Sequence, residues 1–414
     1  MDKLKLYGVP DSQEIYPIRD FLKRSVVDFD WFDISHDDQG RGQGVTSFDN
    51  LGKHPVIEFP DGKIIINPSL EEIACNLGWI TEPKYDEYDL SIYGAGPAGL
   101  SAAVYAASEG LKTILIEREA VGGQAGTSSL IENYLGFPEG ISGANLAERA
   151  RQQALKFGVE ILLLKEGIKG TFYDNKIHVD FASGEKLVAK ANICATGVEY
   201  ARLNLPDEER FFHKGVYYGA GASEAAFCQD KDLYIIGGGN SAGQAATYFS
   251  GFAKRVFMVI RKGNLAETLS EYLIQRIASI KNIFVLYHSQ VTALEGEDYL
   301  QRIKITNSEN GTEAWHETSK LFICIGGKPN TEWASETAIC RDRNGYLFTG
   351  NDVMALDQYK RCWELDRPPF HLETSVPGSF AAGDVRFNSV KRVASAVGEG
   401  AMAVTQVHQY LSKL

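Results

Sequence analysis

Two glycine-rich segments constrain the fold of this chain more than any other feature. Each one joins an apolar strand pattern to a helical pattern and is followed by a second strand: DLSIYGAGPAGLSAAVYAASEG with KTILIE, and KDLYIIGGGNSAGQAATYFSGFA with RVFMVI. In such a unit, glycines permit the tight turn, admit a pyrophosphate close to the backbone, and pack the helix on the sheet. Two units predict two nucleotide sites on parallel sheets, and the β-rich stretches between them add antiparallel layers, so the expected fold class is α/β.

The first turn carries a specific dinucleotide signal. It consists of Gly94, Ala95, Gly96, Pro97, Ala98 and Gly99. A phosphate is expected at the N-terminus of the following helix, where free N–H groups and the positive end of the dipole lie. Glu117, followed by Arg118, ends the next strand at a distance of about twenty residues, where a carboxylate accepts hydrogen bonds from ribose hydroxyls.

The second turn has the same frame but a different strand end. It consists of Gly237, Gly238, Gly239, Asn240, Ser241 and Ala242. Its following strand ends in Arg261 and Lys262 instead of an acid. A basic pair at this place favours the 2′-phosphate of NADP over a bare ribose. The alternative is that the pair is only a solvated strand end.

Composition and charge exclude several classes of protein. The length of 414 residues suits two or three domains, and 44% apolar with 23% charged residues is typical of globular proteins. The net charge of −12 opposes binding to nucleic acid and to anionic membranes. Without an apolar span or a signal-peptide pattern at the first residues, we expect a soluble cytoplasmic protein.

The cysteines and histidines indicate neither a metal site nor a local redox pair. The six cysteines lie far apart, with no C-x-x-C: Cys75, Cys194, Cys228, Cys324, Cys340 and Cys362. Cys194 and Cys324 lie in apolar strand patterns and are expected in the core. The eight histidines lack the spacing of metal ligands. His371 and Glu373 are weak candidates for proton transfer.

From about Asp89 onward, a series of motifs resembles the low-molecular-weight thioredoxin reductase family. They occur in the order GAGPAG, IEREAVGGQ, IENYLGFPEGISG, ATG, GGGNSA, IGGKPNT, SVPGSFAAGDV and KRVASAVGEGAMA. The resemblance implies FAD in the first site and NADPH in the second. It assigns to these cofactors Gly123, Gln124, Asn133, Thr196, Gly197, Gly326 and Gly383, with Asp384 on the ribityl chain and Arg392, Val393 and Ala394 near the flavin ring. It also implies a homodimer.

The expected domains follow from these motifs. The resemblance places the FAD domain at 89–206 and 332–414 and an inserted, rotating NADPH domain at 207–331. Residues 1–80 are predicted to form a small α/β unit of strand, helix, strand, hairpin and helix, and the polar segment 81–88 a linker. The segment 351–370 is extra relative to a minimal reductase, and its role is open.

The sequence departs from the family where the redox-active C-x-x-C belongs. After the family's V-x-Y pattern, VYY is followed by Gly219, Ala220, Gly221, Ala222, Ser223 and Glu224. A flavin-to-disulfide step needs thiols and is not expected here. Cys228 is alone, so only a mixed disulfide remains open to it. Ala266 also replaces a later arginine of the family's 2′-phosphate cluster.

The N-terminal unit resembles a glutaredoxin without its cysteines. Ser12 and Ile15, in LYGVPDSQEI, occupy the approximate cysteine positions, and His54-Pro55 stands where a cis-proline belongs. This predicts a redox-silent thioredoxin fold, with a generic docking domain as the alternative.

The combined hypothesis is an FAD-dependent oxidoreductase that passes electrons from NADPH, or alternatively from NADH, through the flavin to an unknown acceptor. The acceptor stays open between a protein disulfide, a quinone or small disulfide, dioxygen and a one-electron carrier, and a protein could dock on the N-terminal unit. The alternative is a flavin-based sensor or interaction module with little turnover.

Overall fold

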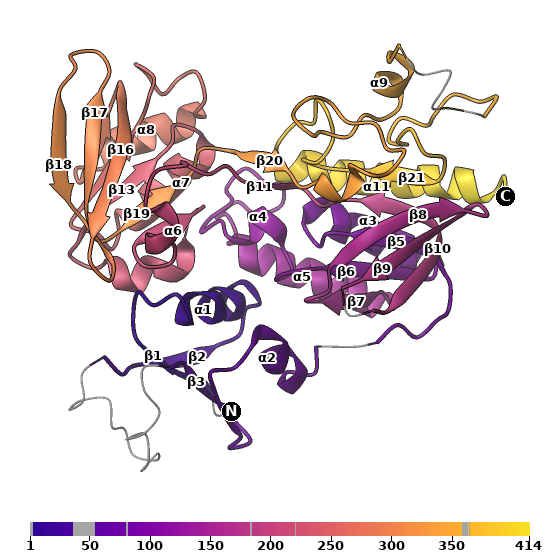
Figure 1. Cartoon of the computed structure of the whole chain (residues 1–414), viewed down its shortest axis with the longest axis horizontal. Coiled ribbons are helices and arrows are strands. Elements are labelled where there is room, and N and C mark those ends of the chain that lie inside the picture. Colours follow the sequence, from indigo (N-terminus) through magenta and orange to yellow (C-terminus); the bar gives the residue numbers. More distant parts are fainter. Residues whose placement is uncertain are drawn as a thin grey trace. The chain divides into compact units, whose positions relative to one another are not determined.

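The chain forms two compact units in this computed structural model. The described residues are 3–35, 54–79, 82–182, 184–219, 221–357, 363 and 365–414. The first unit comprises Met1–Ile73, Thr127–Leu130 and Tyr200–Gly326, and the second comprises Ala74–Gly126, Ile131–Glu199 and Gly327–Leu414. Figure 1 labels their helices and strands. The three-domain division expected from the sequence stays a prediction.

The first unit begins with an N-terminal module, residues 3–35 and 54–73. Its four strands lie in the order β2-β1-β3-β4, with β1 parallel to β2 and antiparallel to β3. The strands are β1 (Leu4–Gly8), β2 (Phe29–Asp33), β3 (Val56–Glu58) and β4 (Ile64–Ile66). Helix α1 (Ile15–Arg24) buries Ile15, Ile18 and Leu22, whereas its Lys23 is exposed. These elements match the predicted order of strand, helix, strand and hairpin.

The module ends in a capped helix and contains a trans proline bond. In α2 (Leu70–Asn76), the Ser69 hydroxyl accepts from Glu72 N–H (3.1 Å), and Glu72 accepts from Ser69 N–H (2.9 Å). This reciprocal box satisfies two N–H groups at the helix start. The chain passes into the second unit within α2. The structure has no cis peptide bond among its described residues, so the expected cis-proline at Pro55 is absent.

The central part of the first unit, Tyr200–Gly326, contains two sheets. A parallel sheet has the order β12-β19-β13-β14-β15, and a separate antiparallel sheet has the order β16-β17-β18. The strands are β12 (Val216–Tyr218), β13 (Asp232–Ile236), β14 (Arg255–Val259), β15 (Ile283–Leu286), β16 (Ser289–Gly296), β17 (Leu300–Asn307), β18 (Glu313–Glu317) and β19 (Leu321–Ile323). The helices are α6 (Glu208–Phe211), η1 (Ala222–Cys228), α7 (Asn240–Phe249) and α8 (Glu271–Ser279).

The second unit has a larger sheet of the order β7-β6-β5-β10-β9-β8, with β21 also paired to β10. Strands β7, β6, β5 and β10 are parallel, whereas β9 and β8 continue the sheet antiparallel. The strands are β5 (Tyr88–Tyr93), β6 (Thr113–Glu117), β7 (Glu160–Leu163), β8 (Gly167–Tyr173), β9 (Lys176–Phe181), β10 (Lys186–Cys194) and β21 (Ser379–Ala381). The short strands β11 (Val198–Tyr200) and β20 (Gly327–Pro329) pair with each other.

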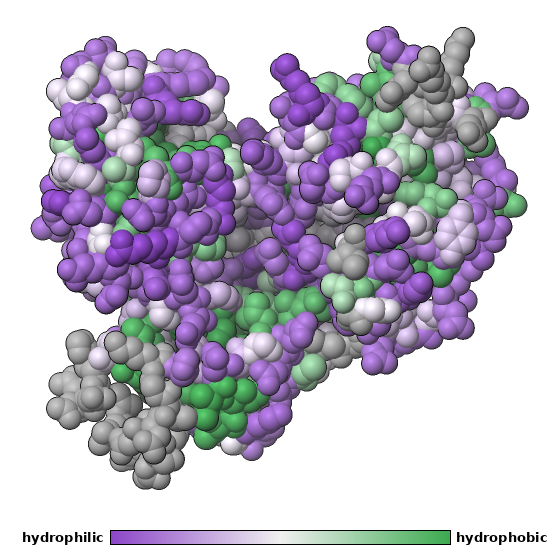
Figure 2. All heavy atoms as spheres, viewed as in Figure 1, coloured by the Kyte–Doolittle hydropathy of each residue, from purple (hydrophilic) through white to green (hydrophobic). Residues whose placement is uncertain are grey.

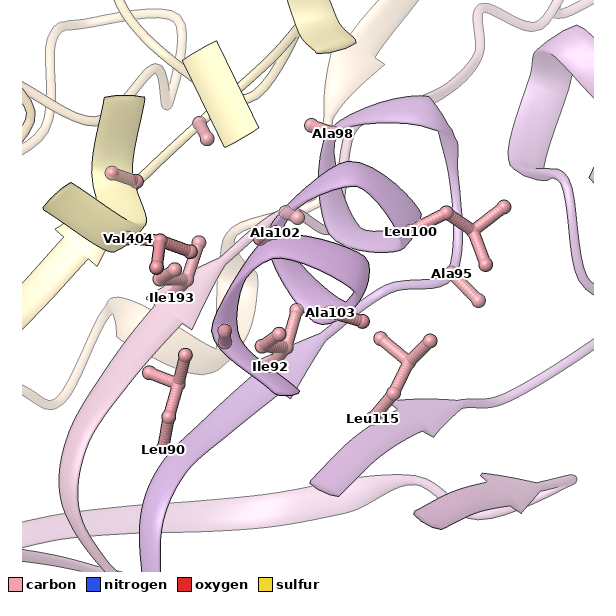
Figure 3. Packing of buried hydrophobic residues seen from close by; sticks show 14 of the residues in the cluster. Leu90, Ile92, Ala95, Ala98, Leu100, Ala102, Ala103, Leu115, Ile193 and Val404 are labelled. Carbon is pink, nitrogen blue, oxygen red and sulfur yellow. The ribbon is translucent and has the colours of Figure 1, made fainter. Parts of the chain in front are cut away.

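The helices of the second unit pack through small residues. They are α3 (Pro97–Ser108), α4 (Gly123–Gly126), α5 (Gly143–Lys156), η2 (Glu332–Ala334), α9 (Asn351–Met354) and α11 (Val393–Leu411). Figure 3 shows Ala102 and Ala103 of α3 beside Ile92 of the sheet. A Cβ at Gly400 of α11 would lie 2.2 Å from the Ala98 carbonyl oxygen. The helix pair therefore requires glycine at this crossing.

The extra segment is anchored to the second unit by a buried carboxylate. Glu373 is 0% exposed and accepts two hydrogen bonds from the Arg367 guanidinium, at 2.6 and 2.8 Å. Trp363 is buried and donates to the Arg367 carbonyl. Residues 358–362 and 364 lie outside the described residues. On the surface, hydrophilic residues predominate on the face in Figure 2, in keeping with the net charge of −12.

Candidate functional site

The first glycine of the turn after β5 is required by the backbone. Gly94 has a φ of +100°, and a Cβ there would lie 2.4 Å from the Ala195 carbonyl oxygen. At Gly99 a Cβ would lie 1.8 Å from the Gly94 carbonyl oxygen. Both positions exclude a side chain, so the chain turns from β5 into α3 as the motif predicts.

The second glycine faces another glycine across an open backbone surface. A Cβ at Gly96 would meet only Gly123 Cα, at 3.9 Å, whereas a Cβ at Gly123 would approach Gly96 Cα to 3.1 Å. Gly123 has a φ of +55°. The bare backbone leaves room beside the N-terminus of α3, where Pro97 and Ala98 begin the helix. This cradle fits the pyrophosphate of a dinucleotide.

Glu117 at the end of β6 both faces the site and braces the turn. Its side chain is 8% exposed and accepts from the N–H groups of Ala95 (2.7 Å) and Glu119 (2.8 Å). A carboxylate offers about four acceptor positions, so it can also accept from ribose hydroxyls. The motif predicts that Glu117 binds ribose. Its hydrogen bonds to the turn could be seen only in the structure.

The three polar residues after Glu117 differ in their surroundings. Arg118 donates to Glu199 (2.7 Å) and also lies near Glu119 and Glu166. Burial lowers the pKa of Arg118, but the carboxylates around it outweigh this effect and raise the pKa. Gln124 donates to the Val198 carbonyl (2.8 Å), whereas Asn133 is exposed.

Thr196 and Gly197 connect β10 to the segment after β20. The Thr196 hydroxyl donates to the Asn330 carbonyl (2.8 Å), and Asn330 N–H donates to the Gly197 carbonyl (3.1 Å). Gly197 has a φ of +62°. The ATG motif therefore fixes the backbone at the carboxyl end of β10, the edge where parallel sheets bind ligands.

Gly383 brings the segment after β21 against the start of α3. It has a φ of +81°, and a Cβ there would lie 2.9 Å from Ala98 Cβ. Its N–H donates to Glu399 of α11 (2.6 Å), which also pairs with Arg386 (2.7 Å). These contacts hold Asp384, the next residue, near the N-termini of two helices.

The Asp384 carboxylate is suited to bind hydroxyl groups. It is partly buried, and we find no hydrogen bond to it among the described residues. Burial raises its pKa, which Glu399 also raises, while Lys391 and Arg392 lower it. A desolvated acceptor of this kind fits the sugar-like chain of a bound flavin nucleotide.

The three residues expected near the flavin ring begin helix α11. Arg392 is the N-cap residue and is exposed, and Val393 and Ala394 form the first turn. Ser101 of α3 donates to the Val397 carbonyl of α11 (2.7 Å), which ties the two helix starts together. The free N–H groups of this turn form a second anion-attracting helix end.

The turn after β13 repeats the arrangement in the first unit. Gly237 has a φ of +136°, and a Cβ there would lie 2.3 Å from the Cys324 carbonyl oxygen. A Cβ at Gly239 would have no atom within 4 Å. The Asn240 side chain accepts from Ser270 N–H (2.8 Å), and Ser241 is exposed at the start of α7. This turn can hold a second pyrophosphate.

The two basic residues after β14 are not equivalent. Lys262 forms an ion pair with Glu267, and this bond lowers the Glu267 pKa. Arg261 is exposed and forms no ion pair with any described residue. Arg261 is therefore the better-placed cation for an added phosphate. Gly326, after β19, has a φ of +87° and accepts from Ala201 N–H (3.0 Å).

The remaining candidate residues are either exposed at the surface or held in contacts that stabilise the fold. His371 is exposed, and Glu373 is taken up by its bonds to Arg367. Cys194, Cys228 and Cys324 are free and buried, and burial raises the pKa of each thiol to about 12. No group of three His, Cys, Asp or Glu side chains in the described parts of the chain could hold a metal ion. None of the described helices is long and apolar enough to cross a membrane.

Comparison with known proteins agrees with this geometry. Residues 88–400 match the model of the pyridine nucleotide-disulphide oxidoreductases. The chain belongs to this family. It is 32% identical to the thioredoxin reductase of Chlamydia trachomatis over 78% of this chain and 98% of the relative. It is 33% identical to that of Bacillus subtilis over 79% of this chain and 96% of the relative.

Solved structures extend the comparison to the fold. The thioredoxin reductase of Lactococcus lactis has a TM-score of 0.70 at 29% identity and covers 79% of this chain and 100% of its own. That of T. acidophilum has a TM-score of 0.69 at 28% identity and covers 78% of this chain and 99% of its own. The protein is thus a thioredoxin reductase-like flavoprotein oxidoreductase that uses FAD and NADPH. The α/β fold predicted from the sequence is confirmed.

Proposed function

We propose that this protein passes electrons from NADPH through FAD to an acceptor without a redox-active cysteine pair. The observation that carries the proposal is the backbone at Gly219 and Gly221. Gly219 has a φ of +85°, and a Cβ there would lie 2.4 Å from the Tyr200 hydroxyl oxygen. Gly221 has a φ of +54°, and its Cβ would lie 2.4 Å from Phe322 Cε1. A cysteine at either glycine would have to displace an aromatic ring and adopt a left-handed φ, so both positions are unfavourable for a thiol.

The cysteines elsewhere are poor substitutes. The thiolate is the form that attacks a disulfide, and a pKa of about 12 keeps Cys194, Cys228 and Cys324 protonated at neutral pH. Cys75 is exposed and free. Cys362 lies outside the described residues.

The residues of the chain bind and orient the cofactors. Gly96 and Gly123 admit the FAD pyrophosphate, Glu117 holds its ribose, and Asp384 holds its ribityl hydroxyls. When bound, FAD supplies the hydride and electron transfer chemistry. Gly239 admits the NADPH pyrophosphate, and Arg261 binds the 2′-phosphate. The remaining predicted site residues stay assigned to these two cofactors.

The acceptor, the assembly and the domain limits are parts of the same proposal. Small disulfides, quinones, dioxygen and one-electron carriers are the acceptors compatible with a thiol-independent route. We propose a homodimer, as the family resemblance implies, and the domain limits given by the motifs.

We further propose that the N-terminal module is a thioredoxin-type fold without redox activity. The strand order β2-β1-β3-β4 with α1 after β1 supports this assignment. Ser12 stands at a reactive-cysteine position, but its hydroxyl accepts from Ile15 N–H (3.2 Å) at the start of α1. Ser12 therefore supports a helix start where a thiol would react.

The deciding experiment is steady-state NADPH consumption over a panel of acceptors. We expect multiple turnovers with at least one non-thiol acceptor and little with thioredoxin. A flavin-based sensor would instead be reduced once and stop. A flavin that NADPH does not reduce at all would contradict the proposal. For the substitution of Asp384 by asparagine discussed below, the matched control is Asp357→Asn, which makes the same change at an exposed site.

A further inference from the structure

A cluster of four charges, three buried and one partly buried, lies between the N-terminal module and the central part of the same unit. The charge cluster consists of Asp11 and Arg19 from the module and Glu224 and Lys320 from the central part. Arg19 is 2% exposed, and Glu224 and Lys320 are 0% exposed. None of these four residues is a predicted cofactor-site residue.

The ion pairs of the charge cluster cross from one part to the other. Arg19 pairs with Glu224, and Lys320 pairs with both Glu224 (2.9 Å) and Asp11. The Tyr217 hydroxyl donates to Asp11 (2.9 Å) and accepts from Lys320 (3.1 Å). The attraction between Lys320 and Asp11 offsets the cost of removing these two charges from water. This attraction is lost if the two parts separate. A buried charge that loses its partner is strongly destabilising.

Aromatic side chains surround the charge cluster. The Arg19 guanidinium lies 4.1 Å from the Phe227 ring centroid, and the Trp31 ring meets Phe227 edge-on at 5.6 Å. Tyr16 stacks on His213 with centroids 4.1 Å apart. Burial lowers the His213 pKa to about 4, so this ring is neutral at neutral pH and adds no charge to the contact. Such desolvated cation–aromatic contacts favour a stable interface.

The docked surfaces coincide with the two segments in which the family resemblances place reactive cysteines. Asp11 directly precedes Ser12 before the start of α1, and Glu224 lies in η1, two residues after the end of the Gly219–Ala222 segment. Gln13 also donates to the Phe212 carbonyl, at 3.1 Å. Both segments are without thiols, and beside each of them lies a carboxylate that pairs with a cation of the other part.

We propose that the N-terminal module is a permanently docked internal partner that occupies this face, so that no separate thioredoxin-fold protein binds there. The occupant is the start and buried face of α1, and the receiving surface is Tyr217, Glu224, Phe227 and Lys320. This inference deepens the proposed function and rests on it for the claim that electrons leave the flavin by another route.

A cross-link in the full chain tests the docking. The Ser223 hydroxyl lies 3.4 Å from an Asp20 carboxylate oxygen. In a Cys75→Ser background, Asp20→Cys with Ser223→Cys should form an intramolecular disulfide under mild oxidation, measured by peptide mass spectrometry. The matched control is Asp30→Cys with Ser223→Cys. Asp30 is exposed and precedes Trp31 on β2, so its side chain points to the opposite sheet face. Equal cross-linking in both variants would overturn the docking.

A charge reversal tests the role of the ion pairs. In the cross-linking background, Arg19→Glu should slow disulfide formation at least ten-fold, because it places a second carboxylate beside Glu224. Lys23→Glu makes the same change at an exposed position of α1 and should leave the rate unchanged. Arg19→Met removes the charge without repulsion and should give an intermediate rate if Arg19→Glu does not fold. A cross-linking rate unaffected by Arg19→Glu and by Arg19→Met would overturn the inference.

Activity of the cross-linked protein separates this inference from the proposed function. If the module stays docked, flavin reduction by NADPH and turnover with a non-thiol acceptor should agree within two-fold before and after the disulfide is reduced. Loss of turnover only in the cross-linked form would show that the module must move, and would overturn permanent docking. Absence of flavin reduction in both forms would contradict the proposed function and leave the cross-linking result to decide the docking.

Discussion

In the proposed site Asp384 would bind the ribityl chain of FAD, and its burial carries a cost to the fold. Because burial raises the pKa of this carboxyl above its ordinary value of 3.8, the unfolded chain releases this proton first as the pH rises. The contribution of Asp384 to stability therefore falls from pH 3.8 up to the raised pKa and stays unfavourable at neutral pH. A bound hydroxyl chain would offset this cost.

We expect Asp384→Asn to separate the two effects. FAD affinity should fall about 10- to 100-fold, since a hydrogen bond to a charged group contributes about 1.5–3 kcal/mol. The FAD-free protein should be at least as stable as the wild type at pH 7, and this advantage should disappear at low pH. Thermal unfolding of the FAD-free protein and FAD titration measure the two quantities. A marked loss of FAD-free stability at pH 7 would contradict the assignment, and Asp357→Asn is the control.

The difference between Arg261 and Lys262 gives a second prediction at this scale. Arg261→Ala should lower kcat/KM for NADPH about ten-fold and leave that for NADH unchanged, because a charge-assisted contact is lost from one cofactor only. Lys262→Ala should have a smaller effect because Glu267 already binds this lysine. Equal effects on NADPH and NADH would remove Arg261 from the 2′-phosphate site.

At the scale of elements, each strand–turn–helix unit assigns different tasks to its glycines. Gly94 and Gly237 have positive φ and meet carbonyl oxygens, so they serve the fold. Gly96 and Gly239 have open space beside them, so we expect each to admit a pyrophosphate close to the backbone. The motif predicts the turn at the first glycine and the approach of a pyrophosphate at the second, and the structure has open space at these second positions.

Alanine substitutions should reveal this division. Gly94→Ala should lower the free energy of unfolding by at least ~1–3 kcal/mol, the usual cost of a residue held in a strained conformation. Gly239→Ala should keep the melting temperature within a few degrees but raise the KM for NADPH, because the added methyl group takes the place of the pyrophosphate. Calorimetry and kinetics on the same preparations measure both. A stable Gly94→Ala protein would contradict the role given to this turn.

The sequence predicted elements where a local pattern carries the information. The two glycine turns, the strands around them and the order of the N-terminal elements all follow from local periodicity and turn residues. The pairing of β21 with β10 joins distant segments and has no local signal. The same holds for Arg19 and Lys320. Charged side chains are normally exposed, so their burial could not be predicted without knowing the surface that each one meets.

For the whole molecule, the decisive prediction concerns the cysteines. A variant with Cys75, Cys340 and Cys362 changed to serine and the buried cysteines changed to alanine should retain NADPH-driven flavin reduction. Alanine is chosen for Cys194, Cys228 and Cys324 because a buried hydroxyl without a partner destabilises the fold.

The wild type supplies the complementary measurement. It should fail to reduce an ordinary thioredoxin at a useful rate, while turnover with a non-thiol acceptor should be the same in wild type and variant. Efficient reduction of thioredoxin by the wild type, lost on changing one or two cysteines, would show that distant thiols cooperate. That result would refute the cysteine-independent route.

The ion pairs between the N-terminal module and the central part also determine the order in which these parts can assemble during protein synthesis. Asp11 and Lys320 are separated by 309 positions in the chain. At ribosomal rates of about 5–20 residues per second, Asp11 waits roughly 15–60 s before its lysine is synthesised. During this interval the newly made first strands and helix must remain soluble with an apolar, charged surface uncovered. The first segment to emerge is therefore among the last to reach its final environment.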